Sequence, residues 1–351
     1  MINRAKQTLF YGRRGTETHF ALQDAMVELE GGAGCALYPC GTAAIANTIL
    51  AFVKTGDHIL MVDGCYEPTR DYCETILKRM GIETTYYDPM IGEGIRELIR
   101  PNTTVLFTES PCSITMEVQD VPLLARIAHE SDIVVMLDNT WAAGVNFSPF
   151  DHGVDISVQA ATKYIVGHSD VMLGTAVANE KHWDQLREQS YLMGQCISPD
   201  DAYLAMRGIR TMGVRLKQHE KSSIKVAKWL EAHPLVDHVR HPALASCPGH
   251  EFYQRDFKGC NGLFSFVLKQ SDSKATTALL DGMTHFSMGY SWGGFESLIL
   301  ANEPRSFNAL RTIANPNFEG TLIRVHIGLE DVEDLIHDLD EGLQRYQDAL
   351  N

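Results

Sequence analysis

The segment Val134-Val-Met-Leu-Asp138-Asn-Thr-Trp141 is an apolar run that ends in an aspartate. Similar short runs, rich in Val, Ile, Leu and Thr, alternate with longer mixed stretches and cover residues 58–62, 82–87, 104–108, 133–137, 156–159 and 171–175. This alternation is typical of βα units, and nearly continuous apolar strands are typical of parallel sheets that helices cover on both faces. The pattern predicts an α/β domain with a mostly parallel sheet.

The second half of the chain has a different pattern. Residues 200–232 form a long helical zone that we expect to be interrupted at Gly208 and Gly213 and to end before Pro234. Beyond this connector, residues 262–268 predict an extended segment, and a terminal strand and helix follow. The terminal helix carries one apolar stripe at a period of 3.6 residues, made of Val332, Leu335, Ile336, Leu339, Leu343, Tyr346 and Leu350. The C-terminal third is therefore predicted to be a second α/β domain.

The composition excludes several classes of protein. A chain of 351 residues that is 44% hydrophobic can form more than one core, and its net charge of −15 makes nucleic acid an unexpected partner. The longest apolar stretch, residues 43–53, is too short to span a membrane. No secretory signal opens the chain, so we expect a cytoplasmic protein with no membrane partner.

The eight cysteines are expected to be reduced thiols, and His238 and His241 lack further ligands nearby, so no metal is expected.

Three local features could carry chemistry. Gly41 and Thr42 begin an apolar, Ala-rich helix whose free N–H groups could bind an anion, although a capped buried helix is the simpler alternative. Asp138 closes a strand at the sheet edge where parallel-sheet enzymes bind ligands, although such an aspartate is often only a turn residue. Lys163 lies in an apolar strand-and-turn context, where burial would lower the pKa of its amine and make it nucleophilic toward an aldehyde.

Together, these features match the contacts that pyridoxal 5'-phosphate (PLP) requires. Its aldehyde bonds to a lysine, its protonated ring nitrogen pairs with a carboxylate, and its phosphate lies at a helix N-terminus. No dinucleotide fingerprint or Walker loop is present, so a nucleotide is not indicated. Alternation in the segment 322–328 places Arg324 and His326 on one face of a strand, where Arg324 could bind a substrate carboxylate rather than lie on the surface.

The chain resembles the Cys/Met metabolism family of PLP-dependent enzymes from Tyr11 to the C-terminal helix. The similarity is densest in residues 11–19, 39–44, 109–111, 137–142, 159–170, 290–296 and 322–330. The resemblance implies the fold-type-I architecture of PLP-dependent transferases, in which a large domain with a mostly parallel seven-stranded sheet is joined to a smaller C-terminal α/β domain. It also implies three segments: an N-terminal arm that contributes to the neighbouring subunit (1–18), a PLP-binding domain (19–211) and a C-terminal domain (212–351).

The resemblance further implies roles for individual residues. Lys163 matches the lysine that bonds to the cofactor, Asp138 the partner of the pyridine nitrogen, and Tyr66 the tyrosine that stacks on the ring. The positions that match phosphate ligands are Gly41, Thr42 and Thr162, joined by Tyr11 and Arg13 from the neighbouring subunit. Many relatives have a serine where this chain has Ala160, so one hydrogen bond to the phosphate is missing here. Ser291 and Arg324 match the positions that hold the substrate α-carboxylate, and Trp292 matches a residue that lines the pocket.

Within the family, the resemblance is to the cystathionine β-lyase branch. It implies β-elimination of L-cystathionine to homocysteine, pyruvate and ammonia in methionine biosynthesis, with Lys163 as the base and Lys163 or Tyr66 as the acid that protonates the thiolate. It also implies a homo-oligomer with shared active sites, at least a dimer and more often a tetramer. Two alternatives remain open: a γ-lyase or γ-synthase of the same family, which shares most of these residues, and a regulatory PLP-binding protein with little catalysis.

Overall fold

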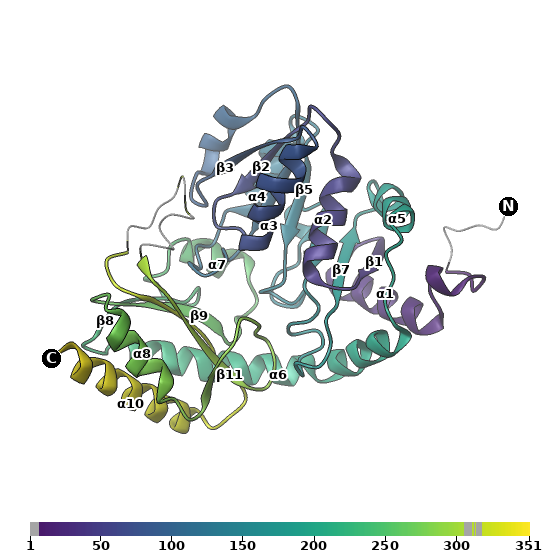
Figure 1. Cartoon of the computed structure of the whole chain (residues 1–351). Helices are drawn as coiled ribbons and strands as arrows, with labels where there is room; N and C mark the ends of the chain where they lie inside the picture. The colour runs from purple at the N-terminus through teal and green to yellow at the C-terminus, as the bar shows by residue number, and fades with distance from the viewer. Residues whose placement is uncertain (1–6, 305–310, 312, 314–317) are drawn as a thin grey trace.

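Two β-sheets and the helices around them make up the structure, a computed structural model that describes residues 7–304, 311, 313 and 318–351 (Figure 1). The large sheet has the strand order β1-β7-β6-β5-β4-β2-β3. Strands β2 to β6 are parallel, and β7 is antiparallel to both of its neighbours. The strands are β1 (Gly34–Tyr38), β2 (His58–Val62), β3 (Glu83–Tyr87), β4 (Thr103–Glu109), β5 (Val134–Asp138), β6 (Ile156–Gln159) and β7 (Gly174–Ala178). The mostly parallel, seven-stranded sheet is therefore confirmed.

Two strands of this sheet differ from the sequence prediction. Strand β1 was not predicted, because a short segment with Gly and Ala has weak strand propensity and is stabilised here by its ladder with β7. Strand β7 begins at Gly174 and not at Val171. The reason is that the backbone N–H and C=O of Leu173 bond to Thr162 instead of to a neighbouring strand.

Helices pack around both sheets and link them (Figure 1). Those of the large-sheet part are α1 (Glu17–Glu30), α2 (Gly41–Phe52), α3 (Glu67–Tyr72), α4 (Val121–His129) and α5 (Trp183–Leu192). The later ones are α6 (Pro199–Glu231), α7 (His250–Asp256), α8 (Ser273–Asp281) and α10 (Val332–Leu350). Shorter 3-10 or π-helical turns are η1 (Gly12–Arg14), η2 (Cys73–Leu77), η3 (Gly92–Leu98) and η4 (Phe150–His152).

Helix α6 runs without a break along the base of the molecule, from the large-sheet part to the small sheet (Figure 1). The predicted interruptions at Gly208 and Gly213 are therefore wrong. A Cβ atom on Gly208 would lie 2.3 Å from the carbonyl oxygen of Ile165, so the glycine lets the helix approach the turn that carries Lys163. Tertiary packing along α6 outweighs the cost of about 1 kcal/mol that each glycine adds within a helix.

The small sheet has the order β10-β11-β12-β9-β8. Its strands are β8 (Val236–Arg240), β9 (Leu263–Leu268), β10 (Phe286–Met288), β11 (Ser297–Asn302) and β12 (Leu322–His326). Ile323 and Val325 belong to the same buried apolar cluster as the stripe of α10, and the alternate residues Arg324 and His326 occupy the other face. Both the predicted stripe and the predicted alternation are confirmed.

The domain limits remain predictions. The boundary expected between residues 211 and 212 falls within α6, which is common to both parts. Of the arm predicted for residues 1–18, positions 1–6 lie outside the described residues, and the rest contains η1 and the start of α1.

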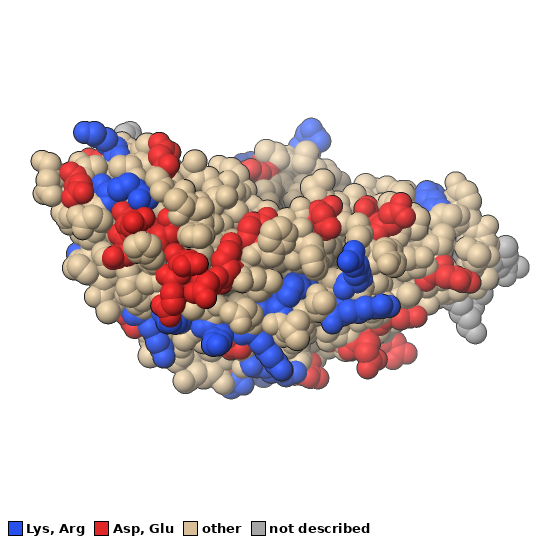
Figure 2. Space-filling model, turned by 90° about the horizontal axis from the view of Figure 1, so that it is seen from below, with Lys and Arg blue, Asp and Glu red and all other residues tan. Residues whose placement is uncertain are grey.

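The surface of the molecule carries charges of both signs. On the underside of the molecule, acidic and basic side chains lie next to each other (Figure 2). Lys225 of α6 forms an ion pair with Glu333 of α10. No helix in the described part of the chain is long and apolar enough to cross a membrane.

All eight cysteines are free, and six of them are buried, as expected for reduced thiols that pack as small apolar side chains.

Candidate active site

Lys163 lies in the turn that follows β6 and faces the loop of residues 289–296, which links β10 to β11. Its Nζ donates a hydrogen bond of 2.7 Å to Oγ of Ser291 and lies 5.1 Å from the centre of the Trp292 ring. Burial, and then the positive charge of Arg324, lowers the pKa of the Lys163 amine to about 8, and Asp138 acts in the opposite direction. Part of the protein therefore has a neutral Lys163 amine near neutral pH, and this neutral amine is nucleophilic.

Asp138 is the last residue of β5, beside β6 in the sheet, so it lies at the same edge as Lys163. Its Oδ1 accepts hydrogen bonds from the backbone N–H of Thr140 at 3.0 Å and from the Thr140 hydroxyl at 2.5 Å. Burial raises the pKa of the Asp138 carboxyl, and the two Thr140 bonds and Lys163 lower it. Since Oδ2 makes no hydrogen bond within residues 7–304 or the other described positions, this oxygen can pair with a protonated ring nitrogen.

Tyr66 lies directly before α3, and its position is fixed from β4. Its backbone N–H donates a hydrogen bond of 2.7 Å to Oε2 of Glu109. The Tyr66 side chain is 43% exposed. Burial raises the pKa of its phenol, as does the charge of Asp138, whereas Arg324 lowers it. Tyr66, Asp138 and Arg324 are thus close enough to interact electrostatically, as required of a ring that covers a cofactor between them.

The N-terminus of α2 is open. Cys40 precedes the helix without a side-chain hydrogen bond to it, so the first N–H groups of the helix, at Gly41 and Thr42, have no capping partner. A Cβ atom on Gly41 would lie 2.6 Å from Cβ of Ala160. The helix N-terminus therefore lies against the segment that leads into Lys163, and glycine is required for this close approach.

The two threonines near Lys163 have different partners. The Thr162 hydroxyl accepts a hydrogen bond from Leu173 N at 2.9 Å and donates to Leu173 O at 3.2 Å, so it stabilises its own turn. Thr140, whose role no sequence pattern indicated, accepts a hydrogen bond of 2.8 Å from Ala160 N and donates to Asp138. Thr140 therefore couples the carboxylate to the Lys163 segment.

Arg324 lies on β12 of the small sheet, whereas Asp138 lies on β5 of the large sheet. Its Nη2 donates hydrogen bonds to the carbonyl oxygens of Gly289 at 3.1 Å and Tyr290 at 2.8 Å. Burial lowers the pKa of the guanidinium to about 10, so Arg324 remains charged at neutral pH. Its Nε and Nη1 donate to no other residue that the structure describes, so they can bind a carboxylate.

The remaining sequence-predicted residues lie elsewhere in the chain. Arg13 donates a hydrogen bond of 3.0 Å to the carbonyl oxygen of Tyr191, and its guanidinium lies 5.7 Å from the centre of the Tyr11 ring. Neither residue contacts Lys163 or Asp138 within the described part of the chain. Residues 7–14 lie beside α1, α5 and the edge strand β1 of the large sheet. The single chain therefore brings together all the proposed site residues except Tyr11 and Arg13.

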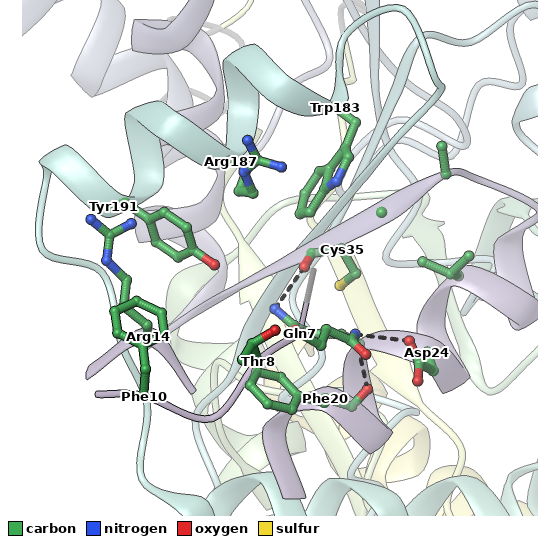
Figure 3. Close-up of a pocket in the computed structure, with 14 residues that line it drawn as sticks. Gln7, Thr8, Phe10, Arg14, Phe20, Asp24, Cys35, Trp183, Arg187 and Tyr191 are labelled. Carbon is green, nitrogen blue, oxygen red and sulfur yellow. Dashed lines mark hydrogen bonds between the residues drawn. The ribbon is translucent and has the colours of Figure 1, made fainter. Parts of the chain in front are cut away.

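A cavity of about 360 Å³ lies beneath this N-terminal segment, between α1, β1 and α5 (Figure 3). Its walls include Arg14, whose guanidinium lies 3.8 Å from the centre of the Tyr191 ring, and Gln7, which donates a hydrogen bond of 2.8 Å to Asp24. Neither Lys163 nor Arg324 lines it. The cavity is thus separate from the candidate active site.

The site fits PLP on three independent observations. An uncapped helix N-terminus can hold a phosphate, a buried carboxylate with one free oxygen can hold a pyridinium, and an amine with a lowered pKa can bond to an aldehyde. Glu109, Thr140 and His326 support these groups and were missed as site residues from the sequence. Only the strand alternation that paired His326 with Arg324 could have indicated one of them.

Comparison with known proteins agrees with this geometry. A family model described as "Cys/Met metabolism PLP-dependent enzyme" matches residues 1–344. A cystathionine β-lyase of Haemophilus influenzae is 61% identical over 345 residues, which cover 97% of this chain and 87% of that protein. The cystathionine β-lyase of Escherichia coli strain K12 is 58% identical over 346 residues, with coverages of 98% and 88%. A human cystathionine γ-lyase is 35% identical over 340 residues, with coverages of 95% and 83%.

Proposed function

Because the chain belongs to the family of Cys/Met metabolism PLP-dependent enzymes, we propose that it cleaves the Cβ–S bond of L-cystathionine by β-elimination. With one water, the products are homocysteine, pyruvate and ammonia. The structural observation that carries the chemistry is the approach of Lys163, Asp138 and Arg324 to one space from two sheets. The specificity for β-cleavage rests on relatives named cystathionine β-lyase that are 58% and 61% identical over nearly the whole chain.

PLP, when bound, supplies an aldehyde that takes up the substrate amine and a ring that accepts the electrons released at Cα. We assign its phosphate to the N–H groups of Gly41 and Thr42 and to the Thr162 hydroxyl, whose proton would turn from Leu173 O to the phosphate. We assign its ring to the space between Tyr66 and Asp138. Ala160 cannot add the hydroxyl that a serine would supply at that position. The Asp138 carboxylate holds the proton on the pyridine nitrogen, because a buried negative charge stabilises the pyridinium.

The chain's own groups then act on the substrate. Arg324 binds the α-carboxylate through its planar fork and so orients the Cα–H bond. Lys163 removes the Cα proton as the general base, and Ser291 orients the amine through its hydrogen bond. Lys163 or Tyr66 returns a proton to the sulfur as the thiolate leaves. Trp292 lines the pocket beside Lys163.

A direct assay tests the proposal. The purified protein with PLP is incubated with L-cystathionine, and free thiol, pyruvate and 2-oxobutyrate are measured. Pyruvate with an equal amount of thiol supports β-elimination, whereas 2-oxobutyrate would identify a γ-lyase. PLP binding without turnover of any sulfur amino acid would favour the regulatory alternative. Lys163→Ala is the control, and a folded variant with normal turnover would refute the assigned role of Lys163.

We further propose a homo-oligomer, at least a dimer, in which Tyr11 and Arg13 complete the phosphate site of the neighbouring subunit. Within the described part of the single chain, Arg13 bonds to Tyr191 and approaches the Tyr11 ring, and neither residue contacts Lys163, which supports this. Co-expression of Lys163→Ala with a Tyr11→Phe/Arg13→Ala variant tests it, because mixed dimers would contain one intact site. Recovery of about one quarter of wild-type activity is expected for random pairing, and no recovery would contradict shared sites.

A further inference from the structure

We propose that His326 is a positioning residue for Lys163. In this role it clamps the 289–296 loop through both ring nitrogens and thereby holds Ser291 against the lysine amine. The catalytic part of this inference, the effect on Lys163 as the base, rests on the proposed function. The structural part, the hydrogen bonds that hold the loop, involves only residues of this chain.

His326 uses both ring nitrogens within one loop. Its Nε2 accepts a hydrogen bond of 3.1 Å from the backbone N–H of Gly293, and its Nδ1 donates one of 3.1 Å to the carbonyl oxygen of Glu296. A ring that accepts at Nε2 and donates at Nδ1 must be neutral, with its proton on Nδ1. The ring is buried, and a Cβ atom on Gly262 would lie only 3.1 Å from Nε2, so the ring has little freedom to turn.

The clamped loop lies directly on Lys163. Gly293 has a φ of +86°, and a Cβ atom there would lie 2.9 Å from the Cα atom of Lys163. Ser291, two residues earlier, accepts the hydrogen bond from Nζ. Fixing the Gly293 N–H therefore fixes the distance between the Ser291 hydroxyl and the amine.

The surroundings keep His326 neutral. Burial lowers the pKa of its imidazole well below the usual range, and the neighbouring His219 and the positive charges of Arg324 and Lys163 act in the same direction. The His219 ring lies 5.2 Å away and donates its own Nδ1–H to the carbonyl oxygen of Ile327. A proton added at Nε2 would remove the acceptor for Gly293, so a neutral ring is a requirement of the clamp.

The clamp also links two parts of the site. Arg324 and His326 lie two residues apart on β12 and share a face of the small sheet. Arg324 bonds to the loop at Gly289 and Tyr290, and His326 bonds to it at Gly293 and Glu296. Strand β12 therefore positions both the guanidinium that binds the carboxylate and the loop that orients the base.

The first test uses cofactor-free protein and needs no substrate. The rate of acetylation of Lys163 is followed against pH by peptide mass spectrometry. In the wild type, labelling is expected to be half-maximal near pH 8. In His326→Asn, which keeps a donor near Nδ1 but has no acceptor at Nε2, the loosened loop exposes the amine. The midpoint is expected to rise by about one unit toward the ordinary lysine value of about 10.4.

Two further variants distinguish a positioning role of His326 from a general disturbance of the buried residues around it. His326→Gln places an acceptor near Nε2 and is expected to restore a midpoint near the wild-type value. His219→Asn alters the neighbouring buried ring but no bond to the loop, and is expected to leave the midpoint unchanged. An unshifted midpoint in His326→Asn, or an equal shift in His219→Asn, would overturn the proposal.

Hydrogen exchange of the peptide 289–297 provides a second measurement on the same proteins. Faster exchange is expected in His326→Asn and not in His219→Asn, because only the former loses the acceptor of the Gly293 N–H. In the loaded enzyme, His326→Asn is expected to lower kcat about tenfold with little change in KM, since the base and not the substrate is misplaced. If L-cystathionine is not cleaved at all, the proposed function fails while the labelling and exchange results remain interpretable.

Discussion

Glu109 and Asp138 lie opposite each other in register at the carboxyl ends of the parallel strands β4 and β5, and both carboxyl groups are buried. Burial, and then the charge of Asp138, raises the pKa of Glu109 well above its usual range. Asp138 is also raised by burial, but it accepts two hydrogen bonds from Thr140 and is close to Lys163. At Asp138 the effect of burial is opposed by the two Thr140 bonds and by the charge of Lys163, and at Glu109 by the Tyr66 N–H and the charge of Arg311.

The first prediction concerns this pair. Asp138→Asn keeps an oxygen for the Thr140 bonds but removes the charge that holds a proton on the pyridine nitrogen, so kcat is expected to fall about 100- to 1000-fold. Glu109→Gln is the matched control, because it keeps an acceptor for the Tyr66 N–H and changes the neighbouring buried carboxyl, which is not assigned to the ring nitrogen. Steady-state kinetics with L-cystathionine measure both, and equal losses in the two variants would contradict the role assigned to Asp138.

The second prediction concerns carboxylate recognition. Arg324→Lys replaces a planar fork by a point charge, so KM is expected to rise about 10- to 100-fold with a smaller change in kcat. Arg345→Lys is the control, because Arg345 also donates to two backbone carbonyls but lies on α10, in contact with α8. A KM that is unchanged in Arg324→Lys would show that another group binds the α-carboxylate.

A third prediction uses two glycines with the same backbone angle. Gly293 and Gly31 both have φ of +86°, but a Cβ atom would contact Lys163 only at Gly293 and would meet nothing within 4 Å at Gly31. Both alanine variants are expected to lose about 1 kcal/mol of stability from the left-handed backbone, and Gly293→Ala is expected to lose more because its Cβ atom meets the Lys163 backbone. Only Gly293→Ala should also lower kcat, by about 10- to 100-fold, because it displaces the base. Urea unfolding and kinetics of both variants check this, and a normal kcat in Gly293→Ala would argue against it.

The fourth prediction concerns α6. Gly208→Ala forces a Cβ atom against the carbonyl oxygens of Ile165 and Val166 and is expected to destabilise the protein by about 2–3 kcal/mol. Gly213→Ala has open space around it and is expected to stabilise the helix by about 0.5–1 kcal/mol. Thermal unfolding of the two variants should show shifts of opposite sign, and shifts of the same sign would disprove the packing argument.

The fifth prediction is a pH dependence of the cofactor-free protein. The pKa of Lys163 is about 8 when folded and 10.5 in the reference state, so between these values the unfolded chain binds a proton that the folded chain does not, and stability rises with pH. Below pH 8 the buried ammonium costs up to about 3 kcal/mol. Lys163→Met is therefore expected to be more stable than the wild type at pH 7. The advantage should shrink as pH rises from 8 to 10.5, and a constant difference would contradict the lowered pKa.

Much of the site could be predicted from the sequence because its strongest signals are local. Asp138 ends an apolar strand, Lys163 lies in an apolar turn, and Arg324 alternates with Ile323 and Val325. Each signal depends on neighbours within a few positions of the chain, where strand periodicity and burial constrain the side chain directly. For the same reason, most strands of the large sheet and the whole of α10 were predicted close to their observed bounds.

Other features depended on residues that are distant in the sequence. Strand β1 exists because β7 provides its hydrogen-bonding partner, and α6 continues through Gly208 because the helix packs on the Lys163 turn. The bonds of Thr162 to Leu173 and of His326 to the 289–296 loop join segments that no local pattern relates. The amino-acid order alone thus indicated the α/β class, the candidate site residues and the family. The folded chain determined which partners hold those residues, because hydrogen bonds and close packing between distant segments form only when the sheets are assembled.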